Sequence, residues 1–335
     1  MIMNESLNER CRLFIENQSV FERAFPWENS YFYPVCAALF TDKGRKADAE
    51  ELKDTRRFLR EKVNAFSNFR SIAELVIVTM LALEDDREKR FAETIEIYGS
   101  LKGYFWSSEY LPIASIILSG AVDKEKYGEI CERTRRIYDL MKKEHPFLTS
   151  SEDSVFAAML ALSNKSDEDI LRECEGCYGI LKEYFYDKNA LQSLSHVLVL
   201  SDDGIRSASD KCRDTVRIYE MLKEKNCKYG KGYELATLGV LATLPCGLDE
   251  AVRDMVSVSD FLKEQKGYGF FGVGRELRLM HAAMIVTSEH LGGSQAMSGA
   301  AIGSTLSLIA AQQAATCAAI AASVAASNAA RAGSH

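Results

Sequence analysis

Acid–base chemistry is the first activity that the residue types of this chain could support. General acid–base catalysis needs a carboxyl group within reach of the substrate and with a suitably shifted pKa. Charged candidates stand beside predicted turns at Glu109, Glu152, Glu234, Arg275 and Glu276. No pair of them has a spacing that fixes a site, so an enzyme remains an alternative interpretation.

Two short motifs resemble cofactor or metal signatures but lack the required context. Cys174-x-x-Cys177 is a single pair, whereas zinc would need two more ligands at a matching spacing. Residues 267–272 fit G-x-G-x-x-G but follow a predicted helix, whereas a dinucleotide fingerprint follows a strand. The histidines form no compact ligand set: His145, His196, His281 and His290. We therefore predict no metal and no cofactor.

A repeat of about 40 residues determines where these side chains lie. An aromatic residue followed four positions later by lysine recurs at Phe58/Lys62, Tyr98/Lys102, Tyr138/Lys142, Tyr178/Lys182 and Tyr219/Lys223. A fixed period in the range of about 20–50 residues is typical of repeat architectures. Each lysine is expected near the end of a helix, where a cation complements the helix dipole, and each aromatic ring is expected in the core.

Each unit is predicted to contain a short, very apolar helix and a longer amphipathic one, after a first helix at 6–24. The short helices are expected at 31–41, 70–84, 109–121, 152–163, 189–201, 233–244 and 275–289. The long helices are expected at 46–64, 87–103, 124–145, 168–185, 206–226 and 248–265. The fold class is therefore all-α, with six to seven helical hairpins in one domain over 1–292. Stacked hairpins form either a closed α/α toroid or an open superhelical solenoid, and short helices that are apolar all round belong inside.

The two sets of connections differ in composition. Those from a short to a long helix are brief and acidic, whereas those from a long to a short helix are rich in aromatic residues and glycine. An exposed aromatic patch is uncommon unless it binds something. We predict a ligand-binding rim that includes Tyr104, Trp106, Tyr184, Tyr186, Tyr229, Tyr233, Glu234, Tyr268, Arg275 and Glu276. The alternative is that the aromatic residues hold adjacent units together.

The last segment departs from the repeat. No Asp, Glu, Lys or Arg occurs from His290 to Ala330, and alanine dominates. We expect 293–335 to form an alanine-rich helix and tail packed on or inside the repeat domain. The expected anchors are Ile302, Leu306, Ile309, Ile320 and Val324. A membrane span needs about 20 predominantly apolar residues, and this stretch is too polar and alanine-rich to insert easily.

Composition limits the partners and the cellular compartment that we expect for this chain. The net charge of −7 over 335 residues argues against a nucleic-acid partner, which would need a basic face. The start of the chain has no apolar signal segment, and nine scattered cysteines suit a reducing compartment. We expect a cytoplasmic protein.

The repeated aromatic-x-x-x-Lys units, followed by Ala310-Ala311-Gln312-Gln313-Ala314-Ala315, resemble the bacterial family known as domain of unknown function 4003. The resemblance covers essentially the whole chain and implies a bacterial cytosolic protein, with no functional residue to carry over. The preferred interpretation is a helical-repeat scaffold that uses the aromatic rim or a concave face to bind a peptide, protein or apolar ligand. An α/α-barrel enzyme with carboxylates on the aromatic rim is the alternative, and a protein bound to a membrane by its C-terminal helix is a weaker one. The oligomeric state stays open.

Overall fold

Helices make up all the regular secondary structure that the computed structural model describes, over residues 3–71, 74–106, 108–201, 206–229, 232, 234–269 and 273–292. No strand occurs in these ranges, so the all-α prediction is confirmed. The α-helices are α1 Glu5–Ala24, α2 Tyr33–Asp42, α3 Ala49–Lys62, α4 Glu74–Ala82, α5 Arg87–Tyr104, α6 Leu111–Ala121, α7 Tyr127–Glu144, α8 Asp153–Ala161, α9 Asp167–Leu181, α10 Lys188–Leu200, α11 Ala208–Glu224, α12 Leu235–Thr243, α13 Leu248–Lys263 and α14 Arg275–Gly292. Short 3₁₀ turns lie at Ser30–Phe32, Asn68–Arg70 and Lys124–Lys126.

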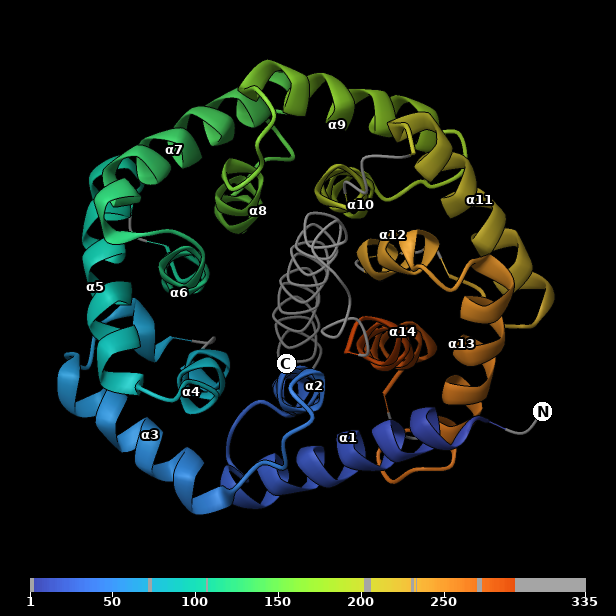
Figure 1. Cartoon of the computed structure of the whole chain (residues 1–335), viewed down its shortest axis with the longest axis horizontal. Helices are drawn as coiled ribbons and strands as arrows, with labels where there is room; N and C mark the ends of the chain where they lie inside the picture. Colours follow the sequence, from blue (N-terminus) through green and yellow to red (C-terminus); the bar gives the residue numbers. More distant parts are fainter. Residues whose placement is uncertain are drawn as a thin grey trace, which may run out of the picture.

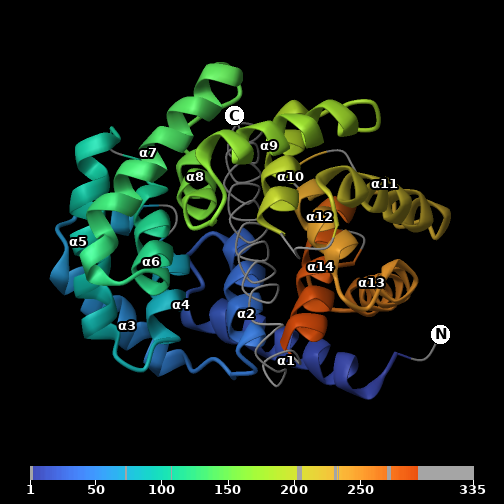
Figure 2. The same cartoon turned by 45° about the horizontal axis from the view of Figure 1, so that its top comes forward.

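The helices lie in two concentric layers. The odd-numbered helices run around the outside, and the even-numbered helices stand inside them (Figure 1). Each inner helix packs on the next inner helix along the chain, from α2 on α4 to α12 on α14. Figure 2 shows the same two layers after the molecule is tilted. One hairpin therefore consists of a long outer helix and the short inner helix that follows it.

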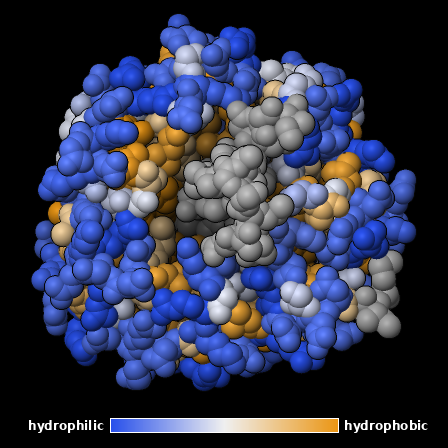
Figure 3. Space-filling model, viewed as in Figure 1, coloured by the Kyte–Doolittle hydropathy of each residue, from blue (hydrophilic) through white to orange (hydrophobic). Residues whose placement is uncertain are grey.

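Side-chain polarity explains which helix lies inside. In α6, every residue from Leu111 to Ser119 is buried, as expected for a helix that is apolar all round. Helix α7 instead buries one stripe, which includes Ile130, Ile137 and Met141, and leaves its acidic side exposed. Figure 3 shows the result, with hydrophilic residues around the outside and hydrophobic residues toward the middle.

Polar residues at the N-termini of the outer helices accept hydrogen bonds from free backbone amides. Asp86 accepts from the amide of Lys89 at 2.9 Å, and Asp48 accepts from Glu51 at 2.8 Å. Such caps satisfy donors that have no partner within the helix. At α9 the cap is Ser166, whereas the neighbouring Asp167 accepts from Arg133 of the preceding outer helix at 2.8 Å.

The first and last helices meet and form a seam, which we define as the contacts of α13, α14 and their connection with α1 and α2. Helix α14 packs on both α1 and α2. The Tyr268 hydroxyl lies 3.1 Å from Gln18 Oε1, to which it donates. Arg10 Nε donates to Glu289 Oε2 at 2.7 Å. These residues are about 250 or more positions apart in sequence, so the described helices follow each other around a complete ring (Figure 1).

The predicted alanine-rich helix and tail at 293–335, with its five expected anchors, lie outside the described residues. Among the helices that the structure does describe, none combines the length and the apolar character needed to cross a bilayer.

Candidate functional site

Five consecutive connections from an outer to an inner helix each hold one large aromatic side chain that is almost fully exposed. These rim aromatics are Trp27, Phe66, Trp106, Phe147 and Tyr186, with exposed fractions between 88% and 99%. They are separated by 39, 40, 41 and 39 residues, so each occupies an equivalent place in its repeat unit. They follow helices α1, α3, α5, α7 and α9, in the connections that run from an outer to an inner helix, and therefore lie on the same side of the ring.

A second aromatic side chain in four of these connections packs against the next outer helix, and it is buried in three of them and partly buried at His145. We call these the staple residues: Phe69, Phe105, His145 and Phe185. Their partners are the repeated tyrosines Tyr98, Tyr138, Tyr178 and Tyr219, at centroid distances of 4.9, 5.1, 4.7 and 5.2 Å. Three of the four pairs are edge-to-face, a favoured arrangement of aromatic rings. The staples thus join each unit to the next.

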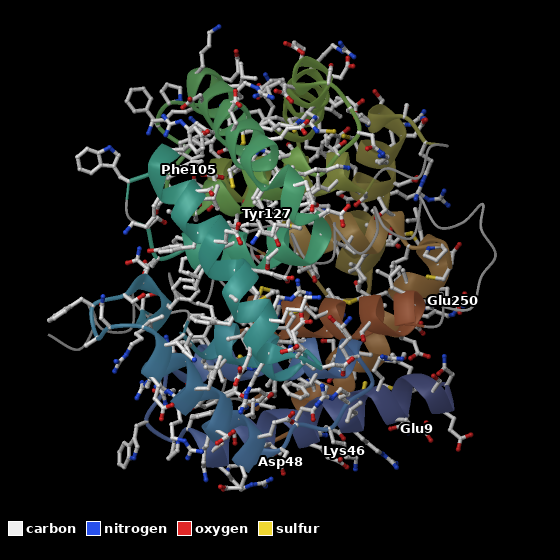
Figure 4. The ribbon with its side chains drawn as sticks, turned by 60° about the vertical axis from the view of Figure 1, so that its left-hand side comes forward. Glu9, Lys46, Asp48, Phe105, Tyr127 and Glu250 are labelled. Carbon is white, nitrogen blue, oxygen red and sulfur yellow. The ribbon has the colours of Figure 1, made fainter. Side chains whose placement is uncertain are left out.

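The end of α5 shows how one connection supplies both kinds of ring. Phe105 terminates the helix with extended backbone, while its amide still donates to the Leu101 carbonyl at 2.9 Å. Successive side chains on extended backbone point to opposite sides. Phe105 therefore packs inward, and Trp106 is 96% exposed. In Figure 4, Phe105 lies on one side of the ring and Glu250, near the start of α13, lies on the other.

The recurring lysine lies near the end of its helix and also contacts an aromatic ring. In four units its ammonium lies over the aromatic ring four residues earlier, at 5.6–6.0 Å from the ring centroid. The pairs are Lys62/Phe58, Lys102/Tyr98, Lys142/Tyr138 and Lys223/Tyr219. This distance is that of a cation–π contact. At Tyr98, Tyr138 and Tyr219 the lysine therefore lies over an aromatic ring that also packs against a staple residue.

A partly buried ion-pair network supports the first of these connections. Arg56 lies over the Phe25 ring at 5.3 Å and donates to Glu74 at 2.7 Å. Arg60 also donates to Glu74, at 2.6 Å. Burial acts to raise the pKa of Glu74, but the hydrogen bonds from Arg60 and Arg56 outweigh it and hold this pKa below its ordinary value. A pocket of about 430 Å³ beside this network is lined by Ala24, Phe25, Lys53, Arg56, Arg57, Arg60 and Glu61.

The predicted ligand-binding residues separate into two groups. Trp106 and Tyr186 are exposed, Tyr104 and Tyr184 are about half exposed, and Arg275 and Glu276 lie exposed at the start of α14. The others that the structure describes are buried and do not lie on an accessible rim: Tyr229, Tyr268 and Glu234. Tyr233 lies outside the described residues.

The two buried tyrosines serve the packing of the ring. The Tyr229 hydroxyl donates to the Leu279 carbonyl at 2.9 Å, and Tyr268 bridges Gln18 and His281 at 3.1 and 2.9 Å. Burial raises the pKa of both phenols. Their role is therefore to fix α14 and the seam.

The predicted ligand-binding residues did not include Trp27, Phe66 or Phe147, although Phe66 and Phe147 lie in the connections that were predicted to form the aromatic rim. The signal that could have found them is their spacing of about 40 residues from Trp106 and Tyr186. Trp27 and Phe147 each follow a proline directly after an outer helix, a position where the chain leaves helical geometry.

Two acidic residues at the start of α8 have shifted pKa values that come from burial. Burial raises the pKa of Glu152 and raises that of Asp153 to about 7. Asp153 accepts a hydrogen bond from the Ser150 amide at 2.8 Å and so closes the turn before the helix. This contact gives Asp153 a structural role. A different cluster, of Glu250, Asp254 and His290, has donor atoms near enough to hold a metal ion.

The sequence of this chain matches a described protein family. The family model "Protein of unknown function (DUF4003)" matches residues 17–314, so the chain belongs to this family. The chain is also similar to the uncharacterized protein YeaA of Bacillus subtilis, at 24% identity over 321 residues, which cover 93% of this chain and 94% of YeaA. No solved structure matches the chain.

Proposed function

We propose that this protein is a closed α/α toroid of repeated hairpins that binds a partner protein through its five rim aromatics. The single observation that carries the proposal is the regular exposure of Trp27, Phe66, Trp106, Phe147 and Tyr186 on one side of the ring. Large aromatic side chains that are at least 88% exposed are hydrophobic surface kept in water. Aromatic residues are enriched in protein interfaces, and tryptophan and tyrosine are common among the residues that dominate binding energy.

The spacing of the rim aromatics indicates the size of the partner. Neighbouring packed helices are about 8–10 Å apart, so five consecutive units spread their aromatic side chains over an arc of roughly 30–40 Å. A small apolar ligand could touch only one or two of them. A protein surface can contact all five, because a standard interface buries about 800 Å² on each partner. The surface between the five aromatic side chains is polar and charged, which suits an interface with separate aromatic anchors.

If the rim aromatics bind the partner, replacing them should lower the affinity for the partner and leave the fold intact. We expect the triple variant Trp106→Ser, Phe147→Ser, Tyr186→Ser to melt like the wild type, because these side chains are at least 88% exposed. Its affinity for the partner should fall at least about 100-fold, since interface anchors of this kind each contribute about 2 kcal/mol or more. To identify the partner, a photo-crosslinking amino acid is placed at position 147 in cells, and the adduct is identified by mass spectrometry. The partner is then purified and titrated calorimetrically.

Matched controls come from the opposite side of the ring. A crosslinker at Glu125 should give no adduct, and the double variant Asp85→Ser, Glu125→Ser should bind the purified partner as the wild type does. The proposal fails if the crosslinks are the same from both sides. It fails equally if the triple serine variant keeps its affinity.

A further inference from the structure

Four side chains with metal-binding atoms meet where α13 and α14 pack together near the seam. Cys246 precedes α13, Glu250 and Asp254 lie one turn apart on α13, and His290 lies in the last turn of α14. Glu250 is labelled in Figure 4, on the side of the ring opposite Phe105. The spacing Cys-x-x-x-Glu-x-x-x-Asp places three of these residues along one face of the helix and its N-terminal approach.

The donor atoms already lie close together. His290 Nε2 is 2.7 Å from Asp254 Oδ2, and the donor atoms of Glu250, Asp254 and His290 all lie within 4.8 Å of one another. Together with Asp254, the Cys246 thiol contributes to the raised pKa of His290, and it donates a hydrogen bond to the Gly247 carbonyl at 3.6 Å. In a tetrahedral zinc site with bonds of about 2.0–2.3 Å, the donor atoms are roughly 3.3–3.8 Å apart. Small side-chain rotations would bring Glu250, Asp254 and His290 to that geometry, and the Cys246 thiol would turn from the Gly247 carbonyl to become the fourth ligand.

Charge and access favour a cation at this position. Two carboxylates face one imidazole, and the adjacent carboxylate of Glu289 is already paired with Arg10. The side chains of Asp254 and His290 are 15% and 13% exposed, so the cluster is mostly withdrawn from water but can still be reached. Without a metal ion the positive charge comes from His290, because its hydrogen bond with Asp254 raises the pKa of the imidazole to about 10, and a bound zinc ion would replace that proton.

The ligand types select the class of metal. Imidazole and thiolate favour zinc and neighbouring transition metals, whereas magnesium and calcium prefer oxygen ligands alone. We propose that Cys246, Glu250, Asp254 and His290 bind a zinc ion that ties α14 to α13 beside the seam. The histidine would bind through Nε2, the nitrogen that now faces Asp254. The ion has a structural role in this arrangement, because four protein ligands complete a tetrahedral shell.

Zinc titration of the full-length chain tests the site. Protein freed of metal with a chelator should bind a single zinc ion and melt at a higher temperature when zinc is present, because the ion binds the folded state. Asp254→Asn and His290→Gln should each weaken zinc binding about tenfold or more. Cobalt should give the visible absorption of a tetrahedral ion together with a thiolate charge-transfer band, and Cys246→Ser should remove that band.

The controls separate this site from other donors in the chain. Asp249→Asn lies one residue before Glu250 and is exposed, so it should bind zinc like the wild type. Cys174→Ser removes half of the C-x-x-C pair and should also leave binding unchanged. Because Asp254→Asn removes a partly buried charge, Cys246→Ser serves as the milder variant if folding suffers. The proposal is overturned if zinc binding survives Cys246→Ser and His290→Gln, if Cys174→Ser abolishes it, or if magnesium binds as tightly as zinc.

Discussion

Replacing Phe105 by alanine is expected to lower the free energy of unfolding by about 3–5 kcal/mol. The ring is 8% exposed and packs edge-to-face on Tyr138 at 5.1 Å. Arg135 lies over the same ring at 5.3 Å and donates to the Tyr104 carbonyl at 2.6 Å. Truncation leaves a cavity between two units and removes one side of this stack. Chemical denaturation monitored by circular dichroism measures the loss.

The adjacent residue provides the matched control. Trp106→Ala removes a larger ring one position away, but that ring is 96% exposed, so the expected change in stability is within about 0.5 kcal/mol. Equal destabilisation by the two variants would show that Trp106 packs in solution and would remove the distinction between staple residues and rim aromatics. If Phe105→Ala destabilises the protein and Trp106→Ala does not, the distinction between staple residues and rim aromatics is supported.

Acidification is expected to weaken the fold through two buried histidines, His196 in α10 and His281 in α14. Burial lowers the pKa of each imidazole from 6.5 to about 3. Between these two values the unfolded chain takes up protons that the folded chain does not. Stability that is fully present above pH 6.5 is therefore lost as the pH falls toward 3. At about pH 5 each histidine should reduce the free energy of unfolding by about 2 kcal/mol.

Single variants separate the effect of each buried histidine from that of the other groups that titrate in this pH range. His196→Gln and His281→Gln should each lose about 2 kcal/mol less than the wild type between about pH 7.5 and pH 5. Asp153 changes the stability in the opposite direction. Burial raises its pKa to about 7, so its contribution to the free energy of unfolding is lost as the pH rises through that value. Asp153→Asn should therefore make the acid destabilisation steeper. A wild-type pH dependence in both glutamine variants would contradict the assignment.

The helices were largely predictable because their signals are local. The prediction of 87–103 for one outer helix agrees closely with α5 at Arg87–Tyr104, since the apolar stripe and the capping Asp86 lie within the segment itself. The inner helices were recognisable for the same reason. At α9 the predicted end at 185 lies beyond Leu181, because Phe185 leaves the helix to pack on Tyr219.

The site was less predictable because it depends on contacts between units. Phe105 and Trp106 are adjacent aromatic residues, and only the position of Tyr138, more than thirty residues later, decides which of them is buried. Tyr268 resembled the other loop aromatics in sequence, but its partner Gln18 lies near the other end of the chain. A pattern of residue types does not contain such distant pairings. The same holds for His290, whose neighbours on α13 are 36 or more positions away.

The seam also determines how the molecule opens locally. In a linear array of repeats, stability is a sum of unit and nearest-neighbour terms, so the end units have one neighbour each and fray first. Here Gln18 and Arg10 give the first hairpin contacts with the last one, so neither is a free end. Opening any hairpin breaks two interfaces. Amide hydrogen exchange should therefore be as slow in α1 and α13 as in α7, without the gradient from centre to ends that a linear array shows.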